Sequence, residues 1–295
     1  MYNFNNLYEP TSVEEALRLK KEHPQALFLA GGSDILIKIR EGKLAGCDLI
    51  NIYNLEELRG ICLEDDGSIL IRPLTSFTDV SMHPVIRQYV PVLGEAVDQI
   101  GGPQVRNIGT IGGNICNGVT SADSATTLKA YDATLEIASL DGIRLLPYTE
   151  FNLGPGKVDL REGELLCGIR ITKESYENTS GHYIKYAMRK AMDIATLGCS
   201  VNVRLTSDKK HIDRLRIAFG VAAPTPIRST TVESKVQGHE LNEQLLDIVS
   251  EGALSDVSPR TSWRASKEFR LQLVKEMARR TTKAAVEKAG GTING

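Results

Sequence analysis

Two glycine-rich segments of the chain carry residue types that can hold a phosphate-containing ligand. The first consists of Leu29, Ala30, Gly31, Gly32, Ser33 and Asp34. Paired glycines between a strand and a helix expose backbone N–H groups, and Ser33 adds a hydroxyl, so the segment suits a phosphate. A plain turn also fits this pattern, and the spacing matches neither the P-loop nor the Rossmann fingerprint.

The second segment runs from Arg106 to Asn114 and combines three glycines, one threonine hydroxyl and two asparagine amides. A backbone with so few side chains can approach a ligand closely, although a structural loop fits the pattern equally well. Its candidate ligand contacts are Asn107, Gly109, Thr110, Gly113 and Asn114. Two such segments in one chain predict two sides of a single diphosphate-containing cofactor.

The elements expected around the first segment form a small α/β unit. Ser12 stands three residues before Glu15, which is a capping-box pattern, and it predicts a helix over residues 12–22. The apolar run 26–30 predicts a strand, residues 35–40 a second helix and residues 48–52 another strand.

Two hairpins and a long loop are expected next. Asp66-Gly67 and Asp141-Gly142 each separate two apolar runs, and glycine supplies the positive φ of a tight hairpin turn. Residues 77–99 have a helical pattern. Residues 101–118 are too rich in Gly and Asn for an ordinary helix or strand, and their embedded apolar side chains favour a functional loop over disorder.

The pattern changes after about residue 177. Strands are expected at 182–188, 196–205 and 211–222, followed by helices near 241–256 and 262–289. Because strands follow strands and helices follow helices, this part predicts an antiparallel sheet covered by helices. We therefore expect a first domain over residues 1–177 and a second over residues 178–295.

Composition narrows the class of partner. The 295 residues are 41% hydrophobic and 24% charged, with a net charge of -2, so no basic surface suggests nucleic acid or an anionic membrane. No apolar run reaches the ~18 residues of a membrane helix, and no signal-peptide pattern opens the chain. We expect a cytoplasmic protein whose partners are small molecules and other proteins.

The cysteines and histidines do not form a metal site in the sequence. The five cysteines, Cys47, Cys62, Cys116, Cys167 and Cys199, are at least fifteen positions apart. Iron–sulfur clusters and structural zinc usually use closer pairs, and the five histidines are scattered without ligand spacing. We expect no metal in this chain and reduced, mostly structural thiols.

Three motifs resemble those of the FAD-binding subunit of molybdenum hydroxylases, and more narrowly of bacterial xanthine dehydrogenases. They are AGGSD, GGPQVRNIGTIGGNICNG and SADSAT, and the similarity extends to GVAAPTPIR and PRTSWRASKEFR. The resemblance implies an α+β fold of the vanillyl-alcohol-oxidase type. Its FAD-binding part would have subdomains of about 1–57 and 58–177, and a C-terminal α+β domain like that of CO dehydrogenase flavoproteins would follow.

The resemblance also assigns roles to single residues. It puts the FAD diphosphate on residues 30–34, with further phosphate and ribose contacts from the second segment. Asp123 matches an acid that contacts the adenosine ribose, although a helix cap also fits it. Ile100 stands where some relatives have an aromatic residue. Leu166 and Lys185 match positions that line the flavin ring, while a solvated strand residue is an equal alternative for Lys185.

The family's chemistry implies a division of labour between subunits. Electrons would leave a purine at a molybdopterin centre on a large partner, pass through [2Fe-2S] clusters on a small partner and reduce FAD in this chain, which would give a hydride to NAD+. Arg189 and Asp193 would border the nicotinamide face or form a surface ion pair. A stand-alone flavin reductase or oxidase, and a non-enzymatic nucleotide-binding assembly protein, remain open.

Overall fold

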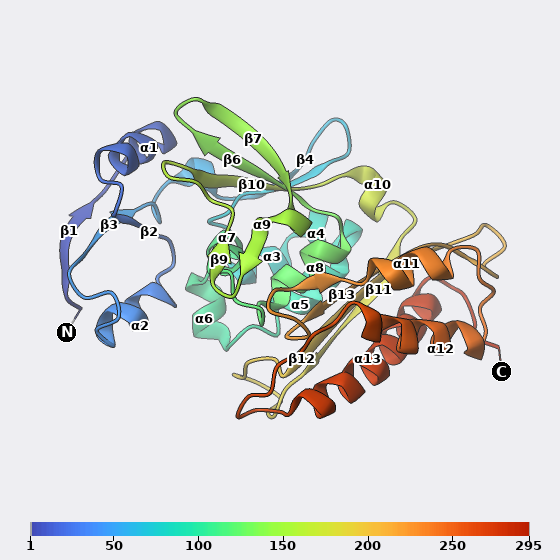
Figure 1. Cartoon of the computed structure of the whole chain (residues 1–295). Helices are drawn as coiled ribbons and strands as arrows, with labels where there is room; N and C mark the ends of the chain where they lie inside the picture. The colour runs from blue at the N-terminus through green and yellow to red at the C-terminus, as the bar shows by residue number, and fades with distance from the viewer. Residues whose placement is uncertain (1, 295) are drawn as a thin grey trace.

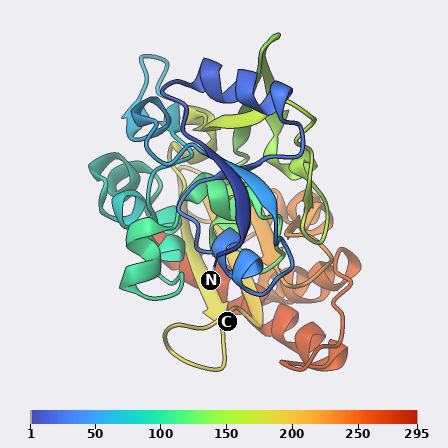
Figure 2. The same cartoon turned by 90° about the vertical axis from the view of Figure 1, so that its left-hand side faces the viewer.

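The N-terminal lobe is a small parallel sheet with two helices. The computed structural model describes residues 2–294. The lobe's strands pair in the order β1-β3-β2, and the Ser12 hydroxyl caps the first helix by accepting the N–H of Glu15. Its elements are β1 (Phe4–Tyr8), α1 (Val13–Glu22), β2 (Leu27–Leu29), α2 (Ile35–Arg40) and β3 (Cys47–Asn51). This lobe lies at the left of Figure 1 and faces the viewer in Figure 2.

A second, antiparallel sheet forms the middle of the molecule, with strand order β4-β5-β10-β6-β7. Both expected hairpins are confirmed, because β4 pairs with β5 across Gly67, whose φ is +80°, and Ser139 pairs with Gly142. The strands are β4 (Ile61–Leu63), β5 (Ile69–Ile71), β6 (Thr134–Ser139), β7 (Gly142–Pro147) and β10 (Leu165–Ile171). Shorter elements are η1 (Glu56–Leu58), α9 (Tyr148–Phe151), β8 (Asn152–Gly154), β9 (Lys157–Val158) and α10 (Lys173–Tyr176).

The helices between the two hairpins correct two sequence predictions. The expected helix over 77–99 is three helices, because Pro84 and Pro91 each begin a new one. The expected loop over 101–118 contains two more short helices, which tertiary contacts described below hold in place. The helices are α3 (Phe77–Met82), α4 (Pro84–Tyr89), α5 (Pro91–Val97), α6 (Pro103–Ile108), α7 (Ile111–Cys116) and α8 (Asp123–Ala130).

The C-terminal part is the predicted antiparallel sheet covered by helices. Its strands are β11 (Ser180–Tyr186), β12 (Leu197–Leu205), β13 (Ile212–Gly220) and β14 (Ile227–Arg228), in that order. Its helices α11 (Thr230–Val236), α12 (Glu243–Gly252) and α13 (Lys267–Lys288), with η2 (Ala253–Ser255), cover one face of the sheet. Helices α5 and α8 pack on strands β11 to β13 of the same sheet. The expected boundary at residue 177 stays a prediction.

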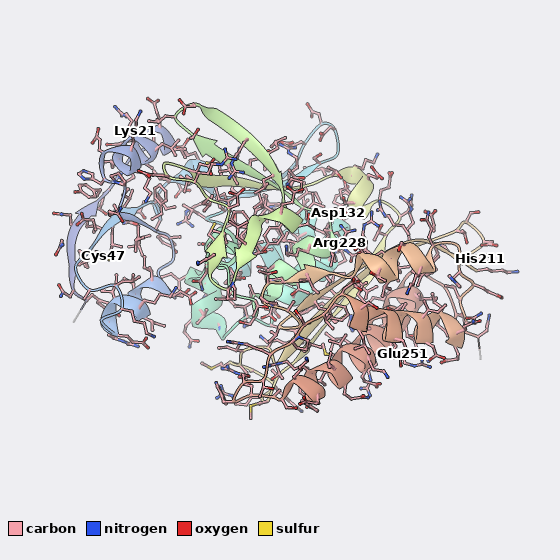
Figure 3. The ribbon with its side chains drawn as sticks, viewed as in Figure 1. Lys21, Cys47, Asp132, His211, Arg228 and Glu251 are labelled. Atoms are coloured by element: carbon pink, nitrogen blue, oxygen red, sulfur yellow. The ribbon has the colours of Figure 1, made fainter. Side chains whose placement is uncertain are left out.

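Charged side chains join the middle and C-terminal parts. Asp132, directly after α8, forms ion pairs with Arg216 and Arg228, and both arginines also pair with Glu233. Asp132 and Arg228 lie next to each other in Figure 3. Within residues 2–294, no helix combines the length and the apolar character needed to cross a bilayer.

Candidate FAD-binding cleft

A cleft of about 820 Å³ lies between the N-terminal lobe and helices α6 and α7. Nine of the fifteen predicted site residues line it: Ala30, Gly31, Gly32, Ser33, Asp34, Ile100, Thr110, Gly113 and Asn114. The two glycine-rich segments, about 80 positions apart in sequence, therefore line one cleft, and their contacts with a cofactor stay a prediction. Lining residues that the sequence patterns missed include Lys20, Phe28, Lys38, Phe77, Asn117 and Leu160.

The first segment owes its position to Gly31 and Gly32. A Cβ on Gly31 would lie 1.8 Å from the backbone oxygen of Ile108, so only glycine lets the two segments approach this closely. Gly32 has a φ of +75°, which favours glycine, and a Cβ there would also meet Leu36 at 2.8 Å. Within the described residues, the N–H groups of Gly31, Gly32, Ser33 and Asp34 have no hydrogen-bond acceptor. They are available to an anion.

The second segment is a capped helix start rather than an irregular loop. The buried Thr110 hydroxyl accepts the N–H of Gly113 at 3.1 Å, which is an N-cap. The N–H of Gly112 donates to Pro73 O at 2.8 Å, and a Cβ on Gly112 would lie 2.3 Å from Pro73 Cβ. Asn114 Oδ1 accepts the Ser124 hydroxyl at 2.7 Å, and its amide N–H groups have no acceptor among residues 2–294, so they can donate to a ligand.

One end of the cleft is apolar. Ile100 lines this end together with Val105 and Phe77, which α3 supplies. A Cβ on Gly109 would meet the Phe77 ring at 2.8 Å, so glycine at this predicted site position makes room for an aromatic side chain. The cleft therefore has an aromatic residue even though position 100 is aliphatic. No local pattern in the sequence pointed to Phe77.

Six predicted residues lie outside the cleft lining. Leu29 ends β2, and its carbonyl accepts the N–H of Ile52. Asn107 is exposed and accepts the Thr78 hydroxyl at 2.6 Å, while Gly109 packs against Phe77. Leu166 is buried in the core of the middle sheet. The ligand roles given to these residues stay predictions, and the remaining two, Asp123 and Lys185, form a separate cluster.

Asp123 and Lys185 are bonded to each other in the interior. Lys185 Nζ donates to Asp123 Oδ2 at 2.8 Å and to Gln99 O at 2.9 Å, and the Tyr183 hydroxyl donates to Asp123 Oδ1. Both charged side chains are less than a tenth exposed. Burial raises the pKa of the Asp123 carboxyl above its ordinary value, although Lys185 and Tyr183 oppose that shift.

The contacts of Asp123 and Lys185 exclude two structural interpretations that the sequence had left open. Asp123 is not the N-cap of α8, because Ala122 occupies that position and the carboxylate is bonded elsewhere. Lys185 is not a solvated strand residue. The ligand contacts predicted for Asp123 and Lys185 stay predictions.

The segment after β11 contains the expected ion pair. Arg189 Nη2 lies 3.7 Å from Asp193 Oδ1, and Asp193 Oδ2 accepts the Arg189 N–H at 2.9 Å. Met192, in the same segment, donates its N–H to Gly101 O at 3.3 Å. The ion pair is confirmed, while the nicotinamide contact stays a prediction.

The lobed fold and the two facing glycine-rich segments define a protein that binds a nucleotide cofactor in a cleft. The chain matches the family model of the FAD binding domain in molybdopterin dehydrogenase over residues 2–173. It also matches the CO dehydrogenase flavoprotein C-terminal domain over residues 182–285. The chain belongs to the family of FAD-binding subunits of molybdenum hydroxylases.

Individual relatives support this family over the full length. The chain is 45% identical, over 99% of its length and 100% of the relative, to the putative xanthine dehydrogenase FAD-binding subunit of Escherichia coli K12. It is 28% identical to the glyceraldehyde dehydrogenase medium chain of Sulfolobus acidocaldarius, over 92% and 95% of the two chains. A chain of carbon monoxide dehydrogenase from Hydrogenophaga pseudoflava superposes with a TM-score of 0.92 at 28% identity, over 98% and 99% of the two chains. The predicted family and α+β fold are confirmed.

Proposed function

We propose that this chain is the FAD-binding subunit of an NAD+-dependent xanthine dehydrogenase. When bound, FAD would supply two-electron redox chemistry, taking electrons from [2Fe-2S] clusters of a small partner and passing them as hydride to NAD+. The purine would be oxidised at the molybdopterin of a large partner. Full-length similarity to a xanthine dehydrogenase FAD-binding subunit supports the choice of substrate and partners. In this role the protein would work in the cytoplasm.

The main structural support for FAD binding is the contact between the two glycine-rich segments. The unpaired N–H groups of residues 31–34 would donate to the diphosphate, and the free amide of Asn114 would donate from the opposite side. The close approach at Gly31 keeps the two sets of donors facing one ligand. Phe77 and Ile100 would exclude water from the apolar end of the cleft.

We assign the Asp123–Lys185 pair to the flavin end of the cofactor. Lys185 donates to Gln99 O, and the next residue, Ile100, lines the cleft. Asp123 would hold the ammonium in a fixed position, where its charge favours the anionic reduced flavin. Leu166 belongs to the buried core against which Ile100 packs, so it would support this end of the cleft from the interior.

Anaerobic mixing of the FAD-loaded chain with NADH tests the hydride step. Loss of the oxidised flavin absorbance is expected, and a flavin that stays oxidised would remove NAD+ from the proposal while leaving FAD binding intact. Co-expression with the two partner subunits tests the substrate. The purified complex should reduce NAD+ with xanthine or hypoxanthine, and a complex inactive with both purines would exclude the xanthine dehydrogenase assignment.

A further inference from the structure

The cleft needs a positive charge that its glycine-rich segments do not supply. An FAD diphosphate carries two negative charges, and the donors of residues 31–34 and 110–114 are neutral N–H and hydroxyl groups. Asp34 adds an exposed carboxylate to the same lining, which would repel the diphosphate. A nearby cation would offset this repulsion.

Three basic residues line the cleft, and one of them, Lys20, is engaged elsewhere. Lys20 Nζ donates to Pro24 O and Ala26 O, both at 2.7 Å. Arg161 is exposed in a segment with two carboxylates, Glu162 and Glu164, that also line the cleft. The third basic residue is Lys38, which has no carboxylate oxygen within 4 Å among the described residues.

Lys38 is placed next to the anion-binding segment by the geometry of α2. It follows Asp34 by four residues, so it lies on the same helix face, and its backbone N–H donates to Asp34 O at 3.2 Å. Its ammonium donates to Asn117 Oδ1 at 3.0 Å. Asn117 is the C-cap of α7, on the opposite side of the cleft. The contact spans the cleft and, within the part of the chain that the structure describes, leaves two of the three ammonium N–H donors free.

We propose that Lys38 is a cofactor-binding residue whose ammonium, held by Asn117 from across the cleft, contacts the diphosphate of FAD. This inference rests on the proposed FAD binding. Sequence alone could have suggested Lys38 through its spacing from Asp34, but the contact with Asn117 joins residues 79 positions apart. The ammonium compensates Asp34 and adds an ionic contact to the neutral donors.

Titration of the FAD-free chain with FAD, followed by flavin fluorescence, tests the role of Lys38. Lys38→Gln should weaken FAD binding about tenfold, the usual size of one hydrogen bond to a charged group. Lys38→Arg should restore most of the affinity because it keeps the charge. Arg40→Gln, an exposed cation on the same helix, is the matched control and should bind FAD like the wild type.

The salt dependence separates an ionic contact from a structural one. Wild-type affinity should fall with rising KCl more steeply than that of Lys38→Gln, because the variant has lost a charge that faces the phosphates. Asn117→Ala keeps this charge, so its salt dependence should match the wild type. Equal weakening in Lys38→Gln and Asn117→Ala, with unchanged salt dependence in both, would reduce Lys38 to a structural bridge and overturn the proposal. If the wild type itself fails to bind FAD, the proposed function fails instead.

Discussion

Gly31→Ala should separate the two glycine-rich segments and release the cofactor. The added Cβ would lie 1.8 Å from Ile108 O, whereas real Cβ atoms stay at least 3.0 Å away, so the two backbones must move apart by about 1.2 Å. Forced overpacking of this kind costs about 1–3 kcal/mol. Because the obstacle is a backbone atom, no rotamer change can relieve it.

Urea denaturation of the FAD-free protein measures the loss of stability, and the flavin released from purified protein measures cofactor content. We expect the Gly31→Ala midpoint to fall and its flavin content to drop well below one FAD per chain. Gly154→Ala is the matched control, because a Cβ there has no neighbour within 4 Å and its φ is not positive. The control should change the free energy of unfolding by less than about 0.5 kcal/mol.

Wild-type stability and flavin content in Gly31→Ala would refute the reasoning, since they would mean that the segments do not need this close contact. A stability loss with normal flavin content would be equally informative. It would show that the contact supports the fold while the cofactor depends on other donors.

Three further predictions concern buried groups. Asp123→Ala should lower the free energy of unfolding by about 3–5 kcal/mol because it leaves Lys185 buried without its acid, and Lys185→Met in the same chain should recover part of that loss in urea titrations. Burial, with a smaller contribution from Arg228, lowers the pKa of Lys129 from 10.5 to about 8. Below pH 8 the buried side chain is charged, and the free energy of unfolding is lowered by the full cost of burying that charge. Relative to Lys129→Met, the wild type should therefore gain up to about 3 kcal/mol of stability as pH rises from 8 to 10.5, and a pH-independent difference would contradict this pKa. Burial raises the pKa of Cys199 to about 12, so a thiol reagent at pH 8 should label the exposed Cys62 and spare Cys199, as peptide mass spectrometry can show.

The first glycine-rich segment was predictable because its signals are local. A strand, two glycines, a hydroxyl and a helix follow one another between residues 27 and 40, and the structure keeps that order. Helix α7 was not predictable from the same rules, because Gly112 and Gly113 disfavour a helix in isolation. Gly112 is tolerated because Pro73 occupies the space of a side chain and accepts its N–H. Tertiary contact therefore overrides local propensity at this position.

The Asp123–Lys185 pair shows a second limit of local patterns. The two residues are 62 positions apart and belong to different predicted domains, so spacing alone could not join them. The resemblance named both residues but gave each a separate ligand contact. Only the packing of α8 on the C-terminal sheet, where it contacts β12 and β13, shows that they share one location.

Helix α8 makes the cofactor cleft depend on the C-terminal part of the chain. All eight of its residues are buried, although five of them are polar or charged, which is stable only when packed elements surround the helix and supply partners. The C-terminal sheet supplies Lys185 and Tyr183 at the start of the helix and the partners of Asp132 just after its end. At the start of α8, Ser124 also holds Asn114 in the cleft. The C-terminal sheet therefore positions a cleft residue through α8, which gives a physical reason for a cofactor site and a C-terminal domain to occur together in one subunit.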